Sequence, residues 1–177
     1  MGKFRRLSYS VCAAATAAIL FVSTPALAAK TCSVANARYV SMADQQWSAG
    51  FTPIHKDRNW ISDVALFVTS LRSGRTYWFM FDAGSARYVN LISTFDVTKP
   101  GWHPPGPDGP ASERPFGQMH YLSTDADLTF SLDIPFQKTP APTYILLPDL
   151  PEWGWYRLPP MERESAPLAF FKLQSCS

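Results

Sequence analysis

Short apolar runs rich in β-branched and aromatic residues recur along this chain, separated by turns rich in proline and glycine. The clearest example is residues 64–82, where VALFVTSL and TYWFMFD flank an RSGR turn. Two β-rich runs around a short turn that contains glycine predict a β-hairpin. We expect Ser70 to pair with Tyr77 and Val68 to pair with Phe79. Both faces of this hairpin are largely apolar, so we expect it in the middle of the fold.

The other apolar runs also have the length and composition of strands. They cover residues 37–42, 51–54, 87–97, 118–122, 128–136, 143–147, 153–158 and 168–173. The run at 128–136 alternates strictly, with Leu128, Phe130 and Leu132 on one side, which predicts one buried and one solvent-facing side. No long amphipathic helix is apparent. The pattern predicts an all-β, single-domain antiparallel β-sandwich, with a closed β-barrel as the alternative.

Residues 99–117 interrupt the series of strands. Six prolines and four glycines among these 19 residues exclude both a helix and a central strand. We therefore expect a long Pro/Gly-rich surface loop that carries Trp102 and His103. Loops of this length within a compact domain are often functional.

The first 28 residues have the features of a secretory signal peptide. Lys3, Arg5 and Arg6 form a positive segment, residues 11–22 are apolar, and Ala-Leu-Ala at 26–28 is a small-residue cleavage site. The expected mature chain is a single all-β domain of residues 29–177, secreted or periplasmic and not attached to a membrane. An uncleaved membrane anchor is the alternative.

Removal of this segment changes the charge balance of the chain. All 14 acidic residues lie after residue 28, whereas 3 of the 16 basic residues lie before it, which leaves a net charge of −1. A surface that neutralises phosphates is therefore not expected, and we predict no nucleic-acid partner.

The mature chain would keep two cysteines, Cys32 near its start and Cys176 near its end. In an oxidising compartment such a pair favours a disulfide, and two free thiols are the alternative. A disulfide here would tie the termini together, so the first and last segments should be neighbours.

Catalytic and metal-binding patterns are weak in this sequence. His55, His103 and His120 show no metal-ligand spacing, and no Gly-rich phosphate loop or nucleotide fingerprint is present. Asp125 and Asp127 could form a carboxylate pair, but turn formation accounts for them more simply. We expect no metal and no cofactor. An extracellular hydrolase would need one of these groups to converge with others in a pocket.

Aromatic side chains offer the stronger functional signal. Trp153 and Trp155 lie two positions apart, so on a strand they would share a face, and Trp102 lies in the Pro/Gly-rich loop. Exposed rings of this kind can stack on a sugar or anchor a protein interface. We therefore predict a non-enzymatic binding or interaction protein whose partner is a protein or a polysaccharide.

One short region resembles a known family. SARY at residues 85–88 and TKPG at residues 98–101 are similar to the paired S-G-x-x-Y and T-K-G elements of periplasmic inhibitors of c-type lysozyme. This chain has alanine in place of the usual glycine in the first element, and a proline interrupts the second. The resemblance implies a small exported β-barrel that inhibits a cell-wall hydrolase, with Ser85 and Lys99 presented to the active-site carboxylates of the enzyme.

Overall fold

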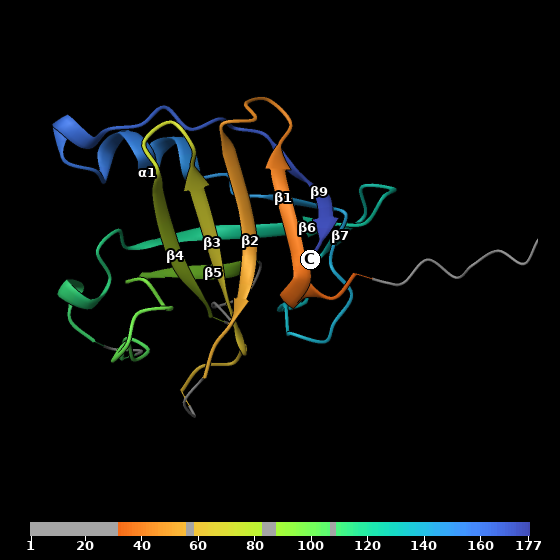
Figure 1. Ribbon diagram of the computed structural model, residues 1–177, viewed down its shortest axis with the longest axis horizontal. Coiled ribbons are helices and arrows are strands. Elements are labelled where there is room, and N and C mark those ends of the chain that lie inside the picture. Colours follow the sequence, from red (N-terminus) through yellow and green to blue (C-terminus); the bar gives the residue numbers. More distant parts are fainter. Residues whose placement is uncertain (1–31, 56–58, 83–87, 107–108) are drawn as a thin grey trace, which may run out of the picture.

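The computed structural model describes residues 32–55, 59–82, 88–106 and 109–177. This part of the chain folds into nine strands, one α-helix and three short 3-10 helices (Figure 1). The strands are β1 (Ala37–Ser41), β2 (Trp47–Pro53), β3 (Val64–Ser70), β4 (Arg75–Asp82), β5 (Val89–Thr94), β6 (Gln118–Thr124), β7 (Phe130–Ser131), β8 (Tyr144–Leu146) and β9 (Phe170–Cys176).

The strands form one antiparallel sheet that closes on itself. Neighbouring strands follow the order β5, β4, β3, β2, β1, β9, β8 and β6, and β5 pairs with β6 to complete the ring. The short strand β7 pairs with β6 and lies outside this ring. The all-β prediction is therefore confirmed in its closed-barrel form rather than as a sandwich.

The two apolar faces of the β3–β4 hairpin are the reason that the sequence favours a sandwich over a barrel. One face packs in the barrel interior. On the other face, Ala65 and Met80 form a small cluster with Trp60 and Ile92, against which Trp102 of the Pro/Gly-rich loop packs. The side chains of Trp60 and Trp102, together with the Pro/Gly-rich loop, thus cover the outer face. In a sandwich a second sheet would cover it.

The register of this hairpin differs from the prediction by two residues. Ser70 pairs with Arg75 and Val68 with Tyr77, so residues 71–74 form a four-residue loop. Gly74 in this loop has a φ of 73°, a conformation that favours glycine. Because side chains alternate with a period of two, a shift of two residues leaves each side chain on its predicted face.

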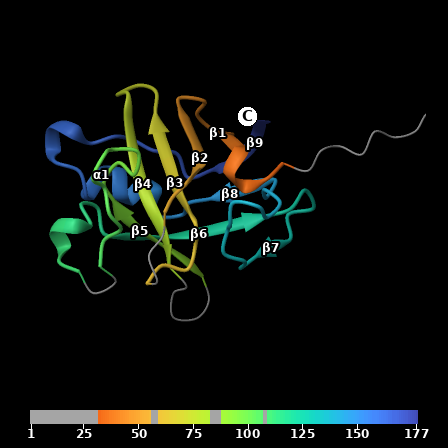
Figure 2. The ribbon, with the colours of Figure 1, turned by 60° about the horizontal axis from the view of Figure 1, so that its bottom comes forward.

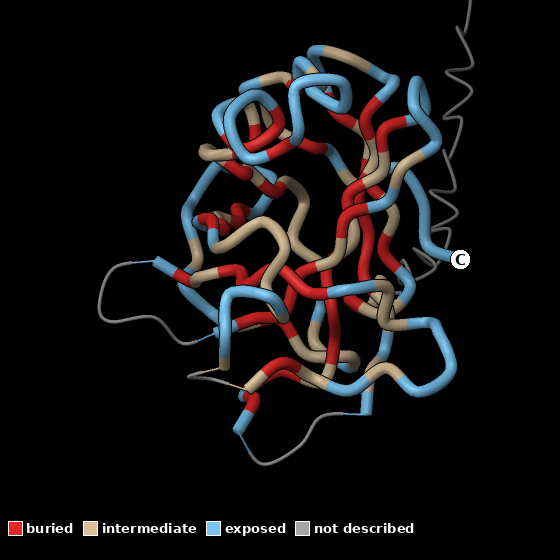
Figure 3. Tube along the Cα trace, turned by 90° about the vertical axis from the view of Figure 1, so that its left-hand side faces the viewer, coloured by how far each residue is buried: buried red, intermediate tan, exposed pale blue. Residues whose placement is uncertain are grey.

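Large aromatic rings fill the barrel interior. Figure 3 shows in red the segments of the chain whose residues are buried. Phe51 contacts Tyr39 edge to face and stacks on Phe81, and Phe81 in turn contacts Tyr121 edge to face. All four rings are buried. The middle of the barrel is therefore a packed core rather than an open channel.

Helix α1 (Leu150–Tyr156) closes one end of the barrel. Its Trp153 is buried, with edge-to-face contacts to Tyr77, Phe79 and Phe116. The predicted aromatic strand at residues 153–158 was therefore wrong. On a helix, residues two positions apart point to different sides, so Trp153 faces the core and Trp155 faces solvent.

Residues 132–143, here called the strap, cross the opposite end of the barrel (Figure 2). The strap is fastened near the start of β3, where the Ser62 hydroxyl donates to the Pro135 carbonyl at 2.6 Å and the Gln137 amide donates to Asp63 at 2.8 Å. Its far end is fastened near β1, where Val34 donates to the Thr139 carbonyl at 2.9 Å.

The strand predicted at residues 128–136 is much shorter than expected. Only Phe130–Ser131 pairs in the sheet, because Leu128 ends a tight turn with a φ of 62° and the chain then leaves as the strap. Leu128, Phe130 and Leu132 are each more than half exposed. The expectation that this apolar side would be buried was wrong.

The Cys32–Cys176 disulfide joins the two ends of the described chain, with a Cα–Cα distance of 5.7 Å. As predicted, the first and last strands are neighbours, since β1 pairs with β9. Within the described residues, no helix has the length and apolar character needed to cross a membrane. The signal peptide predicted at residues 1–28 lies outside the described residues.

Candidate functional site

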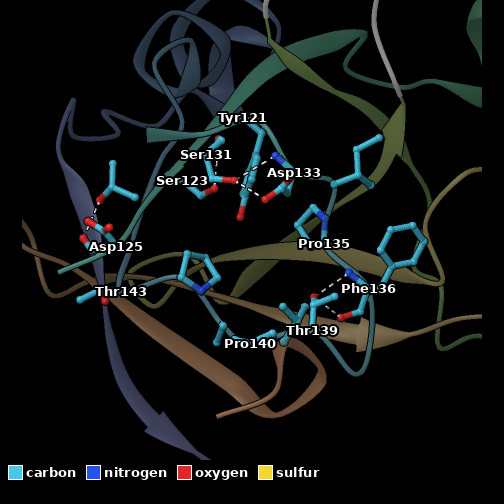
Figure 4. Close-up of a pocket in the computed structure, with 15 residues that line it drawn as sticks. Tyr121, Ser123, Asp125, Ser131, Asp133, Pro135, Phe136, Thr139, Pro140 and Thr143 are labelled. Atoms are coloured by element: carbon cyan, nitrogen blue, oxygen red, sulfur yellow. Dashed lines mark hydrogen bonds between the residues drawn. The ribbon is translucent and has the colours of Figure 1, made fainter. Parts of the chain in front are cut away.

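A pocket of about 600 Å³ lies at the strap end of the barrel, between the strap and strands β6 and β7 (Figure 4). Its volume falls in the range typical of small-molecule sites, which also occur at the mouths of β-barrels. It is lined by Val34, Tyr121, Ser123, Thr124, Asp125, Ser131, Asp133, Ile134, Pro135, Phe136, Thr139, Pro140, Ala141, Pro142 and Thr143.

The pocket exists because small and cyclic side chains make up half of the strap, six of its twelve residues. Prolines at 135, 140 and 142, with Ala141 and two threonines, leave space above the last large rings of the barrel interior. Proline also fixes the backbone into an extended path that spans the opening without forming a strand. The walls are consequently mostly apolar.

Two tyrosines lie at the inner end of this region. The Tyr39 hydroxyl donates to the Pro142 carbonyl at 2.9 Å. The Tyr121 side chain points with its hydroxyl end toward the pocket (Figure 4), and this buried hydroxyl has no hydrogen-bond partner of normal geometry among the described residues. Burial raises the pKa of both phenols well above the usual range, so both remain protonated.

The exposed edge of the pocket carries two carboxylates. Asp133 accepts a hydrogen bond from the Ser131 hydroxyl at 2.9 Å. Asp125 accepts from the amides of Asp127 and Thr129, both at 2.9 Å, and so stabilises the turn before β7. Asp127 does not line the pocket. Asp125 thus acts first as a turn residue, the interpretation that the sequence favoured.

A second hollow, of about 590 Å³, lies beside the Pro/Gly-rich loop on the outside of the barrel. Phe95, Lys99 and Trp102 line it together, and Phe95 is more than half exposed. The Trp102 indole donates to the Thr94 hydroxyl at 3.1 Å and packs against the outer cluster, so the ring is partly buried. The Lys99 ammonium lies 3.9 Å from the Asp96 carboxylate.

The three tryptophans proposed as contact residues do not share a groove. Trp102 lines the loop hollow, whereas Trp153 is buried under α1 with 3% exposure. Trp155 is 48% exposed and lies under the Arg163 guanidinium, 5.7 Å from its ring centre. Trp153 is thus a core residue. The prediction that Trp153 and Trp155 share one face was wrong, because both lie on helix α1 and point to different sides of it.

Ser85, the other residue implied by the lysozyme-inhibitor resemblance, lies outside the described residues. Lys99 is exposed, with 73% of its side chain accessible, in the turn that follows β5. Tyr88, which closes the first of the two elements, precedes β5 at its other end. The proposed pairing of Ser85 with Lys99 therefore remains a prediction.

The three histidines lie apart from the barrel-mouth pocket. None of them lines the barrel-mouth pocket, and the described residues contain no group of three or more histidine, cysteine or carboxylate side chains placed to hold a metal ion. His120 pairs with Asp149 at 2.8 Å on the outer surface. The Asp149 carboxylate also accepts a hydrogen bond from the His120 backbone amide at 2.6 Å, so this pair fastens the start of α1 to β6.

The sequence pattern missed the principal residues of the pocket. Ser131 and Asp133 belong to the polar side of the alternating run, which was expected to face water, and Tyr121 and Ser123 were not singled out. The three prolines spaced along residues 135–142 are the signal that could have revealed a crossing segment in place of a strand.

Comparison of the chain with protein-family models, with curated proteins and with solved structures finds no match.

Proposed function

We propose that this protein is an exported, non-enzymatic binding protein that takes a small, mostly apolar molecule into the pocket at the strap end of its barrel. The observation that carries the proposal is the pocket of about 600 Å³ with the buried Tyr121 hydroxyl at its inner end. An apolar pocket with a few converging polar groups is the usual form of a small-molecule site. The predicted signal peptide and the disulfide support export.

The pocket is better suited to binding than to hydrolysis. Its polar groups are serine and threonine hydroxyls, two carboxylates and a protonated phenol. No histidine is among the described residues that line the pocket, so none is placed to activate a nucleophile there. The Asp125 Oδ1 atom accepts hydrogen bonds from two backbone amides, which fixes this carboxylate in the turn. These features support a non-enzymatic role.

The test uses the mature chain and the neutral fluorescent probe N-phenyl-1-naphthylamine, whose emission rises in apolar surroundings. We expect saturable binding of one probe per chain. Ser123→Leu should abolish this binding, because Ser123 is buried, lines the pocket and would place a larger side chain within it.

Ser112→Leu makes the same exchange in the exposed 3-10 helix Ala111–Glu113, away from the pocket, and serves as the matched control. Circular dichroism establishes that both variants are folded. Failure of the mature chain to bind the probe would contradict the proposal, as would unchanged binding by a folded Ser123→Leu variant.

A second candidate function is inhibition of a c-type lysozyme through the loop hollow. The closed barrel agrees with the fold that the sequence resemblance implies, and Lys99 projects beside Phe95 and Trp102 in a surface suited to a protein or polysaccharide partner. The test is the lysis of bacterial cells by c-type lysozyme in the presence of the mature chain. Inhibition that Lys99→Ala and Ser85→Ala both remove would support this role, and absence of inhibition would exclude it.

A further inference from the structure

The strap offers many backbone hydrogen-bond acceptors and few backbone N–H donors to the pocket. Pro135, Pro140 and Pro142 have no N–H group. Six of the nine other strap amides donate within the fold. Among them, Phe136 donates to the Thr139 hydroxyl, Ala141 to the Cys32 carbonyl and Thr143 to the Thr124 carbonyl. A ligand in this pocket therefore meets several carbonyl and carboxylate oxygens and few free backbone amides.

The charged side chains that line the pocket have one sign. Asp125 and Asp133 are both exposed at its edge, and the lining residues that the structure describes include no lysine, arginine or histidine. The Ser131 hydroxyl already donates to one oxygen of Asp133. An anionic group would find no positively charged side chain among the lining residues, whereas a cation would meet two carboxylates.

The inner end of the pocket has a different character from this edge. The walls here are mostly apolar, and the Ser123 hydroxyl lies near enough to the Tyr121 phenol to offset part of the rise in its pKa. The buried phenol nevertheless has no hydrogen-bond partner of normal geometry among the described residues. Unsatisfied buried polar groups are rare and costly, so a ligand or a bound water is the expected partner. The pocket thus has an apolar interior with one buried phenol and a negatively charged entrance.

From this arrangement we infer that the pocket selects cationic amphiphiles, that is, apolar molecules that carry a protonated amine or a quaternary ammonium group, over anionic amphiphiles of the same size. The apolar body enters between the strap and β6. The cationic head stays at the entrance beside Asp125 and Asp133. This inference rests on the proposed function of the same pocket and adds the chemical class of the ligand.

The experiment is a competition assay on the mature chain loaded with N-phenyl-1-naphthylamine. The competitors are decyltrimethylammonium and decanoate, which have similar chain lengths and opposite charges, each used below the concentration at which it forms micelles. At low ionic strength we expect decyltrimethylammonium to displace the probe at about one tenth of the concentration that decanoate needs. Added salt at 0.5 M should reduce this preference, because exposed charges are then screened.

Asp133→Lys provides the decisive variant, because it places a positive charge at the entrance. It should reverse the preference, so that decanoate becomes the better competitor. Asp127→Lys is the matched control, with the same change of charge two residues beyond Asp125 and outside the pocket. We expect this control to keep the preference within about twofold of the wild type. If Asp133→Lys does not fold, Asp133→Asn should still reduce the preference.

The outcomes separate the inference from the function on which it rests. If neither the probe nor either competitor binds, both the proposed function and the inference are overturned. If the probe binds but the two competitors displace it equally, only the inference is overturned. The same holds if Asp127→Lys alters the preference as much as Asp133→Lys does, since the effect would then come from net charge and not from the pocket.

Discussion

The two ends of this barrel are closed in different ways. At the α1 end, Trp153 fills the opening and contacts three other rings. At the strap end, prolines, threonines and an alanine cross the opening and leave a pocket of about 600 Å³. One end is therefore part of the core, and the other is a candidate site. The difference follows from the size of the side chains on the two connections that cross these ends, and not from the barrel itself.

Trp153→Ala should have the largest effect, because it removes the ring that fills the α1 end. Replacing a buried tryptophan with alanine is expected to cost about 4 kcal/mol in the free energy of unfolding. Urea denaturation of the variant measures this loss. Trp155→Ala, on the exposed side of the same helix, is the control and should cost less than about 1 kcal/mol. Equal losses in the two variants would contradict the division of α1 into a buried and an exposed side.

The double variant Cys32→Ser/Cys176→Ser should destabilise the strap end in particular. The disulfide joins two cysteines that are 144 residues apart in the sequence. The Cys32 carbonyl also accepts a hydrogen bond from the backbone amide of Ala141 in the strap. We expect a loss of about 3 kcal/mol in the free energy of unfolding. Hydrogen exchange should accelerate more at residues 132–143 than in α1. A uniform acceleration at both ends would show that the disulfide does not act preferentially on the strap.

Glu164→Gln should weaken the α1 end in a pH-dependent manner. The carboxylate accepts hydrogen bonds from the hydroxyls of Ser73 at 2.6 Å and Tyr77 at 2.7 Å, and it lies 3.9 Å from the Arg75 guanidinium. Burial alone would raise the pKa of Glu164, but the hydrogen-bond donors and the charge of Arg75 outweigh it and lower the pKa below its usual value.

Because the pKa of Glu164 is lower in the folded state, ionised Glu164 stabilises the fold above its unfolded pKa, and this contribution is lost as the pH falls through the folded pKa. The variant should lose about 2 kcal/mol at neutral pH. The difference between wild type and variant should shrink below about pH 4.5, the ordinary pKa of glutamate. Urea denaturation at pH 7 and pH 3 measures this, and a difference that does not change with pH would contradict the role of the charge.

A pair of tyrosine substitutions gives the smallest and most specific comparison. Tyr39→Phe removes the donor to the Pro142 carbonyl and should cost about 1 kcal/mol in the free energy of unfolding. Tyr121→Phe removes a buried hydroxyl without a partner of normal geometry, so its stability should stay within about 0.5 kcal/mol of the wild type. Thermal unfolding of the two variants compares them. A larger loss for Tyr121→Phe than for Tyr39→Phe would show that the Tyr121 hydroxyl is satisfied in the native state.

Much of the barrel could be predicted from local patterns. The β3–β4 hairpin, the inward faces of its strands and the neighbouring termini follow from alternation, turn residues and two cysteines. The register of the hairpin was less accessible, because two-residue and four-residue loops place the same side chains on the same faces. Only the loop that actually formed distinguishes the two registers.

The candidate site was harder to predict, for an identifiable reason. In residues 128–136 the alternation of apolar and polar side chains is as regular as in any buried strand, yet Phe130 and Leu132 face solvent while Ser131 and Asp133 line the pocket. Alternation shows that a segment has two sides, but it does not show which side meets the core. In this segment the prolines that follow take the chain across the barrel mouth.

By itself, the sequence determined the all-β class, the central hairpin and, for a chain without its predicted signal peptide, the pairing of Cys32 with Cys176. Each of these depends on contacts between near neighbours or on a unique pair of residues. Only the tertiary structure decided that the sheet closes into a barrel, that residues 150–156 form a helix, and that one end is filled while the other keeps a pocket. These features depend on which segments, distant in the sequence, contact one another. The free energy of such tertiary contacts comes from the packing of side chains far apart in the chain, which no local pattern encodes.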